Sequence, residues 1–216
     1  MKVLATNIGE SRSVEWNGET IETGIFKYSV DRGILLGDTD VKGDAVIDRK
    51  YHGGVDKACY MYSADVYDVW KGQYPTSDWS WGMFGENLTI QGLDEQEIYI
   101  GDVYRIGEAL VEVSEPREPC FKLGIRFGTQ AVLKSFVYQP HCGVYVRVLE
   151  QGKVLPGDAM VLVNRAQEEF TMSRIYWLRY HATVSDIQEI ERVLLLQELA
   201  DSAKRGLKKR LSFLVG

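Results

Sequence analysis

Short runs of apolar residues, separated by glycine, make up most of the chain as far as residue 163. Within them, β-branched and aromatic residues cluster or alternate with polar ones, which is typical of β-strands. The runs that predict strands are Gly33–Leu36, Leu88–Ile90, Ile98–Ile100, Val103–Ile106, Ala109–Val113, Val144–Leu149 and Ala159–Val163. So many short strands predict a mainly β fold, either a barrel or a sandwich.

A hairpin is predicted near the start of the chain. The pair Asn17-Gly18 separates Val14–Trp16 from Thr20–Ile21, and Asn-Gly favours the tight turn that joins two antiparallel strands. One helix is predicted inside this β-rich region, with Ser63 as its N-cap and an end near Gly72. We expect this helix to cover an open end of the barrel.

The pattern changes after Glu169, where glycine becomes rare and apolar residues recur at helical spacing. This predicts three helices: Met172–His181, a second capped by Ser185 or Asp186, and a third capped by Asp201 or Ser202. The third carries the apolar stripe Ala203, Leu207, Leu211 and Leu214 opposite the basic residues Lys204, Arg205, Lys208, Lys209 and Arg210. A solvated face is the favoured interpretation of the basic side, and binding of an acidic partner is the alternative.

Composition places the chain among ordinary globular proteins, with 45% hydrophobic and 26% charged residues. No run approaches the roughly 18 apolar residues of a membrane span, and the start does not resemble a signal peptide, so we expect a cytoplasmic protein. The three cysteines form no Cys-x-x-Cys pair, which argues against a structural zinc site. The net charge of −6 argues against nucleic-acid polymers as partners, so an anionic ligand would need local cations.

The first segment with candidate chemistry is HGGVDKA (52–58). Its paired glycines, Gly53 and Gly54, allow the backbone to approach a ligand, and successive N–H groups in such a loop can bind an anion. Lys57 adds a point charge suited to phosphate, and His52 can donate from either ring nitrogen. A glycine turn with a satisfied histidine is the alternative, and both interpretations stay open.

A second segment, FGENLT (84–89), presents polar groups where a strand begins. The amide of Asn87 has both donors and acceptors, as recognition of the edge of a heterocycle requires, and Glu86 adds a carboxylate. The alternative is a turn in which both side chains cap the local backbone, and the spacing does not exclude it.

The third segment, SEPREPC (114–120), follows the strand Ala109–Val113. Its two prolines lack the N–H group that a strand ladder needs, so the strand should not continue easily and the loop should be stiff. Cys120 is then held in a defined place, and the guanidinium of Arg117 favours the thiolate, which acts as a nucleophile or soft-metal ligand. A buried, inert cysteine is the alternative. It fits Cys59 well, and for Cys142 a packed turn residue is favoured over a resolving thiol.

Five segments occur in the order HGGVDKA (52–58), FGENLT (84–89), IGDVYRIG (100–107), SEPREPC (114–120) and GVYVRVLEQGKVLPGD (143–158). In this order they resemble the MOSC family, which is named after the C-terminal domain of molybdenum cofactor sulfurases. The resemblance runs from about Lys2 to Val163. The helical tail is similar to the three-helix extension in a bacterial stand-alone branch of the family. Tyr51 departs from the pattern, since bacterial relatives often have a second histidine there.

The resemblance implies a β-barrel domain over residues 1–165, with a pocket for the pterin-based molybdenum cofactor, and a helical extension over residues 166–216. It implies that Cys120 is the catalytic residue and either ligates molybdenum or carries persulfide sulfur. The phosphate of the cofactor needs cations and backbone donors. The candidate cofactor contacts are His52, Gly53, Gly54, Lys57, Glu86, Asn87, Arg117 and Arg147.

Three functions are weighed on this basis. The first is molybdenum-dependent reduction of N-hydroxylated small molecules such as hydroxylaminopurine bases; the chain has no flavin, haem or iron–sulfur motif, so a separate reductase would supply electrons. The second is a carrier of the cofactor, or of sulfur as a Cys120 persulfide. Without a pyridoxal-phosphate lysine domain, such a carrier could not mobilise sulfur from cysteine itself. The third is a plain β-barrel interaction module.

Overall fold

An eight-stranded mixed sheet dominates the computed structural model, which describes residues 1–49 and 51–216. The order of its strands is β12-β8-β9-β10-β6-β7-β1-β4, and among them β6 and β7 run parallel while the other paired strands are antiparallel. The strands are β1 (Lys2–Gly9), β4 (Lys27–Ser29), β6 (Cys59–Ser63), β7 (Leu88–Gln91), β8 (Val103–Ile106), β9 (Ala109–Pro116), β10 (Val144–Glu150) and β12 (Met160–Asn164). The predicted mainly β fold with helices is confirmed.

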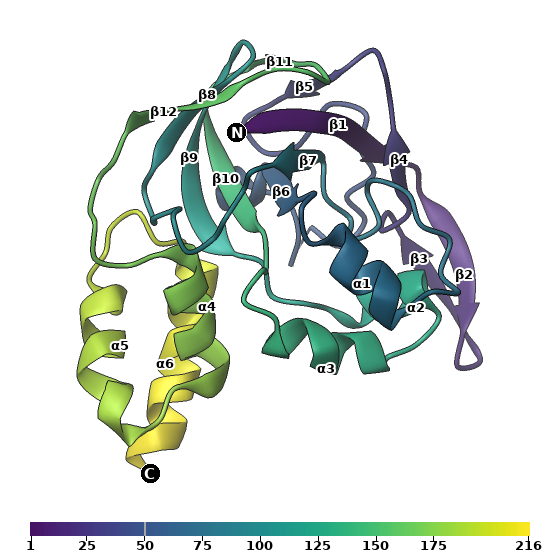
Figure 1. Ribbon diagram of the computed structural model, residues 1–216. Helices are drawn as coiled ribbons and strands as arrows, with labels where there is room; N and C mark the ends of the chain where they lie inside the picture. The colour runs from purple at the N-terminus through teal and green to yellow at the C-terminus, as the bar shows by residue number, and fades with distance from the viewer. Residues whose placement is uncertain (50) are drawn as a thin grey trace.

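Two small sheets and a set of helices complete the fold (Figure 1). The small sheets pair β2 (Arg12–Trp16) with β3 (Glu19–Thr23) and β5 (Ile34–Leu36) with β11 (Gly152–Val154). The helices are η1 (Val55–Lys57), α1 (Tyr67–Gln73), α2 (Phe121–Phe127), α3 (Ala131–Tyr138), α4 (Met172–His181), η2 (Val184–Asp186), α5 (Ile187–Leu194) and α6 (Asp201–Val215).

The sheet curves so that its end strand β12 approaches β1, the strand next to the other end (Figure 1). The N–H group of Val3, in β1, donates to the carbonyl of Asp158 at 2.9 Å, and that of Met160, in β12, donates to the carbonyl of Met1 at 3.0 Å. Strand β1 therefore bonds both to β7 on one side and to the start of β12 on the other, as strands in a barrel do.

The predicted hairpin is confirmed, because β2 and β3 meet at Asn17 and Gly18, whose φ values of 51° and 81° suit its tight turn. The strand predicted over Ile98–Ile100 is wrong. Its backbone bonds to the segment that leads into α4: Met172 N–H donates to the Ile98 carbonyl at 2.8 Å, and Ile100 N–H to the Phe170 carbonyl at 3.3 Å. The run is apolar because it is buried beneath a helix, and a short apolar run cannot distinguish this from a strand.

The helix predicted from Ser63 begins later than expected. Ser63 is the last residue of β6, and the N–H group of Ala64 still donates to the carbonyl of Ile90, next to the sheet. Helix α1 starts only at Tyr67. The expectation of a single helix in this region is also wrong, because α2 and α3 follow Cys120 there. Both helices are short, with seven and eight residues, and α2 buries five residues in a row, so a helical period is hard to detect in the sequence.

The three helices of the extension are confirmed, and α4 has the predicted bounds. The second begins after a capping box in which Thr183 and Asp186 exchange hydrogen bonds, and Asp186 occupies the N-cap position of α5. The predicted cap of the third is wrong: Ala200 occupies the N-cap position of α6, and the hydroxyl of Ser202 donates to Glu115 instead. A side chain that makes a tertiary hydrogen bond is not available to cap the helix.

One hydrophobic cluster joins the extension to the sheet. It includes Val113 of β9 and Ile98, together with Ile175 of α4, Val193 of α5 and Leu207 of α6, all of them at most 1% exposed. Helices α4 to α6 therefore form a bundle that shares its apolar core with one end of the sheet (Figure 1).

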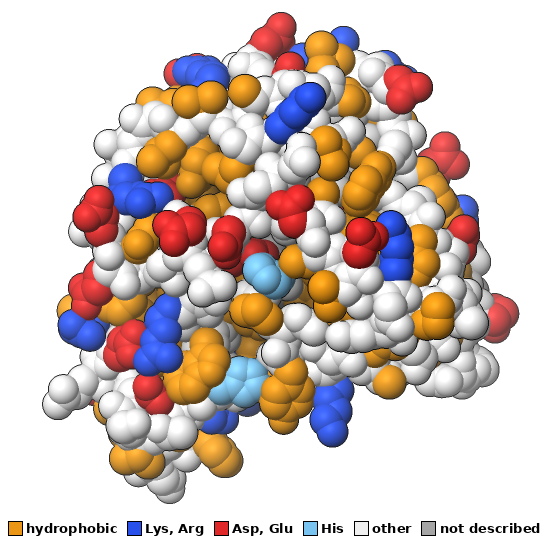
Figure 2. Space-filling model, viewed as in Figure 1, with side chains coloured by type: hydrophobic (Ala, Val, Ile, Leu, Met, Phe, Trp, Pro, Cys, Tyr) orange, Lys and Arg blue, Asp and Glu red, His pale blue; other side chains and the backbone are white. Residues whose placement is uncertain are grey.

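Charged side chains of both signs are interspersed on the face that carries α3 and α4 (Figure 2). Hydrophobic side chains occur there in small groups rather than as one broad patch. Within the described residues, no helix has both the length and the apolar character needed to cross a bilayer.

The shared core predicts that the extension contributes to the stability of the whole chain. Leu207→Ala should lower the free energy of unfolding by about 2–5 kcal/mol, because it opens a cavity where sheet and helices meet. Phe213→Ala, on the same helix but at a position that is 76% exposed, is the control and should change it by less than about 0.5 kcal/mol. Urea unfolding followed by circular dichroism measures both. An equal effect of the two variants would contradict a shared core.

Candidate functional site

Cys120 stands at the junction between β9 and α2. The strand runs further than expected, because Pro116 still pairs with Val144 on β10. A register shift next to Tyr145 accommodates the irregularity, and a proline at the last position of a strand removes little from the ladder. Cys120 then takes an extended conformation, φ −117° and ψ 164°, at the N-cap position of α2. The thiol is half-buried and does not bond to the helix end.

The helical extension holds the segment that precedes Cys120. Arg179 of α4 makes two hydrogen bonds to Glu118, at 2.7 and 3.1 Å. Ser202 of α6 bonds to Glu115 at 2.8 Å, and Ala200 N–H donates to the carbonyl of Ser114 at 3.0 Å. Both charged side chains of the motif that flank Arg117 are thus tied to the helices.

Gly206 allows α6 to pass close to this segment. A Cβ atom there would lie 2.6 Å from Nε of Arg179 and 2.9 Å from Oε1 of Glu118. A glycine inside a helix costs about 1 kcal/mol relative to alanine. The close approach explains why the helix contains one.

Two cavities meet at Cys120. The inner one, of about 80 Å³, lies between β6, the loop that follows β3 and the loop around Gly53, and it is lined among others by Tyr60, Asn87 and Arg117. The outer one, of about 780 Å³, extends from Cys120 to α6. The residues that line both are Asp48, His52, Lys57, Cys120, Lys122 and Tyr145.

Arg117 is a buried cation at the inner cavity. Its side chain is sandwiched between aromatic rings, with the guanidinium carbon 5.1 Å from the ring centres of both Tyr60 and Phe136. The residue is 3% exposed, and its Nη1 has no hydrogen-bond partner among the described residues. Desolvation opposes the charge, but Tyr60, Tyr145 and Cys120 nearby hold the pKa of Arg117 above its ordinary value. A buried N–H donor without a partner is a position where an anionic ligand gains a charge-assisted bond.

His52 lines both cavities in its neutral form. Burial, together with the charges of Arg117, Lys57 and Lys122, lowers the pKa of His52 to about 4. Near neutral pH the ring therefore has one donor and one acceptor nitrogen. The same electrostatic effect shows that three cations surround this part of the site.

The two glycines after His52 have different roles: one lies at the candidate ligand site and the other forms part of a turn. Both residues have positive φ, 73° at Gly53 and 89° at Gly54, which favours glycine. Gly53 lines the inner cavity, whereas the N–H group of Gly54 donates to the carbonyl of Thr39 at 2.8 Å. Lys57, at the end of η1, lines both cavities and lies 3.4 Å from a carboxylate oxygen of Glu115.

The polar pair after Gly85 lies partly outside the site. Asn87 lines the inner cavity, but its amide also bonds to Asp44 at 2.9 Å and accepts from the N–H group of Tyr60 at 3.3 Å. Glu86 does not line either cavity. Its buried carboxylate accepts hydrogen bonds from Gly82 N–H, Phe84 N–H and the hydroxyls of Tyr67 and Thr89. It therefore serves the local turn.

Arg147 also lies away from both cavities. It forms ion pairs with Asp56 of η1 and Glu112 of β9. The alternation of side chains on β10 places it on the face opposite Val146, which is fully buried. The arginine therefore joins η1 to the sheet.

Some residues that line the cavities were not predicted from the sequence. Lys27 and Asp44 form a buried ion pair at 2.6 Å in the inner cavity, and no spacing in the sequence relates them. Lys122, Arg179, Arg205 and Lys209 line the outer cavity. The position of Lys122, two residues after Cys120, is a signal that a search for cations near the motif would have found.

The other two cysteines do not belong to the site. Cys59 is fully buried on β6, and burial raises the pKa of its thiol to about 12. Cys142 is also fully buried, and burial holds its pKa well above the ordinary value. The interpretation of Cys59 as an inert core residue fits this environment.

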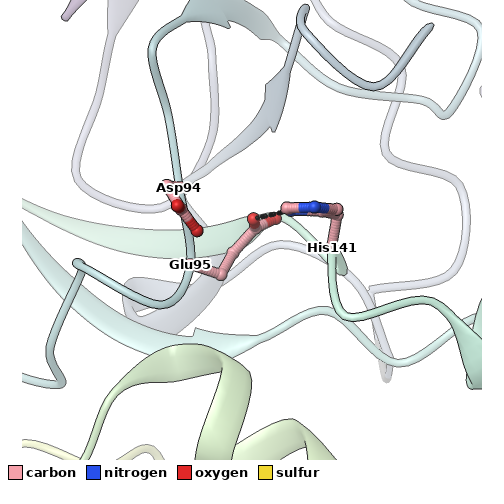
Figure 3. A group of neighbouring side chains, drawn as sticks. All are labelled: Asp94, Glu95 and His141. Atoms are coloured by element: carbon pink, nitrogen blue, oxygen red, sulfur yellow. Dashed lines mark hydrogen bonds and ion pairs between the residues drawn. The ribbon is translucent and has the colours of Figure 1, made fainter. Parts of the chain in front are cut away.

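A separate group of ligating side chains, Asp94, Glu95 and His141, lies close together (Figure 3). Glu95 is fully buried, and its oxygens accept from Gly143 N–H at 2.6 Å and contact Nδ1 of His141 at 2.8 Å. The hydrogen bond to Glu95 raises the pKa of His141. Since the carbonyl of Gly143 accepts from Arg117 N–H at 3.3 Å, the group anchors the backbone beside the site.

A sheet-based fold thus places the half-buried thiol of Cys120 at two cavities lined by the buried cation Arg117 and by further basic side chains. A family model, the MOSC domain, matches residues 48–161, and the chain belongs to this family, which is associated with the molybdenum cofactor.

Curated relatives match nearly the whole chain. The chain is 36% identical to the uncharacterized protein YflK of Bacillus subtilis over 96% of its own length and 93% of the relative. It is 32% identical to protein YiiM of Escherichia coli over 87% and 84% of the two chains. It is also 33% identical to a protein named reductase from Gibberella moniliformis, over 80% of this chain and 31% of that longer protein.

Solved structures support the same fold, including the extension. YiiM from Geobacillus stearothermophilus has a TM-score of 0.80 and 28% identity, over 97% of this chain and 98% of that one. YiiM from Escherichia coli has a TM-score of 0.73 and 26% identity, over 99% and 94%.

The thiol environments predict that native protein is alkylated by iodoacetamide at Cys120. Cys59 and Cys142 should react only after unfolding in guanidinium, because they are buried and their thiolates are disfavoured. Peptide mass spectrometry identifies the labelled positions. Labelling of Cys142 before Cys120 in folded protein would contradict this description of the site.

The pKa values of His52 and His141 should be shifted in opposite directions from that of a free histidine. The ring signals of His52 in an NMR titration should have a midpoint near pH 4, and those of His141 a midpoint above 6.5. Between pH 6.5 and about 4, the unfolded chain binds a proton at His52 that the folded chain does not, so this residue lowers stability as the pH falls. His52→Asn should remove that contribution. A midpoint of His52 at 6.5 would show that the ring is neither buried nor surrounded by the cations.

Proposed function

We propose that this protein binds the molybdenum cofactor at Cys120 and reduces N-hydroxylated compounds with electrons from a separate reductase. The family supports the association with the cofactor, and a relative named reductase supports redox chemistry. The observation that carries the proposal is the juxtaposition of an accessible thiol with a buried guanidinium that has an unpaired N–H group among the described residues.

The donor set fits the cofactor. A cysteine thiolate is a soft ligand of the kind that molybdenum accepts, and Cys120 is the half-buried cysteine of the chain. The anionic pterin phosphate needs cations and donors, which Arg117 and Lys57 would supply, while neutral His52 adds one donor and one acceptor. Asn87 and Gly53 would lie against the ring system.

The reaction consumes two electrons and two protons: an N-hydroxylamine gives an amine and water. When bound, the molybdenum cofactor supplies the two-electron chemistry that breaks the N–O bond. The residues of the chain orient the substrate, limit the access of water and hold positive charge near the developing anion. Electrons would arrive from outside the chain, through the same open side of the outer cavity that admits the substrate.

A carrier function is the second candidate, because Cys120 is accessible from the outer cavity, where its thiolate could take the outer sulfur of a donor persulfide and release the donor as a thiol. In that case the protein would bind the cofactor or bear sulfur without turning over a substrate.

Metal and pterin content test the proposal. Protein purified from a molybdenum-replete host should contain molybdenum and a fluorescent pterin, and it should reduce hydroxylaminopurine with reduced methyl viologen. Cys120→Ser should lose about a hundredfold or more in rate, as expected when a residue that acts only in the reaction is removed. Cys59→Ser, at a buried cysteine outside the site, is the control and should keep both cofactor and activity.

Three other results would separate the alternatives. Wild-type protein without molybdenum or pterin would exclude the reductase. Bound cofactor without turnover would favour the carrier. A mass increase of one sulfur atom at Cys120 without metal would favour sulfur transfer.

A further inference from the structure

We infer that the outer cavity binds a phosphate monoester carried by the substrate, so that N-hydroxylated nucleotides, rather than free bases, are the preferred substrate class. The reaction in this inference is that of the proposed function. Binding of the phosphate, however, depends on residues that the proposed function does not use. Those residues belong to α6, in the extension, and to the start of α2.

The outer cavity is positive in a chain that is negative overall. Five basic and three acidic side chains line it, whereas the whole chain has a net charge of −6. Two of the acids are matched by cations in the same wall, Glu118 by Arg179 and Glu115 by Lys57. The surplus of two positive charges corresponds to the charge of a phosphate monoester near neutral pH, about −1.5 to −2.

The surplus comes from side chains without a protein counter-ion. Arg205 and Lys209 are four residues apart on α6, so they lie on the same face of the helix, and both line the cavity. Among the described residues, Arg205, Lys209 and Lys122 form no ion pair. Asp48 is the one acid in the wall of the cavity that is not matched by a cation there. Like charges at this spacing destabilise a helix, so a ligand that bridges them is favoured.

The rest of the wall suits a heterocycle. Phe121 follows Cys120 directly, lines the outer cavity and is 46% exposed, so the face of its ring can stack against a base. Pro119 adds a further apolar surface beside it. A ligand with a flat ring near Cys120 and a phosphate towards α6 matches this division of the cavity.

The cofactor also carries a phosphate, so two sources of the same chemistry must be distinguished. Arg117, with its unpaired Nη1, lies in the inner cavity and is the cation assigned to the cofactor. Arg205 and Lys209 line the outer cavity on the helical side and do not line the inner one. We therefore assign the outer cations to the substrate.

Binding of adenosine monophosphate and of adenosine, measured by calorimetry on the full-length protein as purified, tests the site without turnover. The monophosphate should bind at least about tenfold more tightly than the nucleoside, as charge-assisted bonds to phosphate predict. Arg205→Ala/Lys209→Ala should remove that difference and leave adenosine binding and molybdenum content unchanged.

Lys204→Ala/Lys208→Ala is the matched control. It removes the same charge from the same helix at positions that do not line the cavity, so monophosphate binding should persist. Equal binding of both ligands, or equal loss in both double variants, would overturn the inference. Loss of molybdenum and pterin from Arg205→Ala/Lys209→Ala would also overturn it, because the outer cations would then hold the cofactor.

Turnover separates this inference from the proposed function. With reduced methyl viologen, KM for the hydroxylamino derivative of the monophosphate should rise at least about tenfold in Arg205→Ala/Lys209→Ala, while kcat/KM for hydroxylaminopurine stays constant. Reduction of the base with no preference for the monophosphate would overturn the phosphate site and leave the reductase intact. Selective binding of the monophosphate with no reduction of either compound would support the site and exclude the reductase.

Discussion

The organisation of the site depends on how the charge of Arg117 is accommodated. Aromatic rings on two sides, rather than a carboxylate, surround its guanidinium, and a ring face attracts a cation without consuming a hydrogen-bond donor. Its backbone N–H donates to the carbonyl of Gly143, and the N–H group of Gly143 in turn donates to the carboxylate of Glu95. Three residues later the same segment presents Cys120. Charge and thiol are therefore positioned by one short length of chain.

The strands and helices that the sequence predicts well are those whose pattern is local. The alternation over Val103–Ile106 and the helical spacing of Met172–His181 match β8 and α4 to the residue. The apolar run Ile98–Ile100 predicts a strand that does not form, because burial beneath a helix produces the same pattern. The cap predicted at Ser202 failed for a similar reason, since the hydroxyl bonds to a distant glutamate.

The candidate site shows the same division. Cys120 and Arg117 could be predicted as site residues, because the two prolines and the nearby cation of their motif can be read directly from the sequence. Glu86 and Arg147 have side chains that could bind a cofactor. In the structure, however, Glu86 bonds to a local turn and Arg147 pairs with two carboxylates. The type of a side chain does not say whether its partner is a ligand or the protein. The sequence of the last helix favours a solvated basic face, whereas the packing of α6 places Arg205 and Lys209 of that face along a cavity.

Gly206 affects how the shape of the outer cavity can differ between related proteins. The distance between α6 and the segment before Cys120 depends on a position that has no side chain, and any larger residue there would meet the Glu118–Arg179 pair. Replacement by alanine would therefore require the side chains of Glu118 and Arg179, which both line the outer cavity, to shift, and would change the shape of the cavity while every lining side chain keeps its identity. Relatives with the same chemical groups could in this way accept ligands of different size.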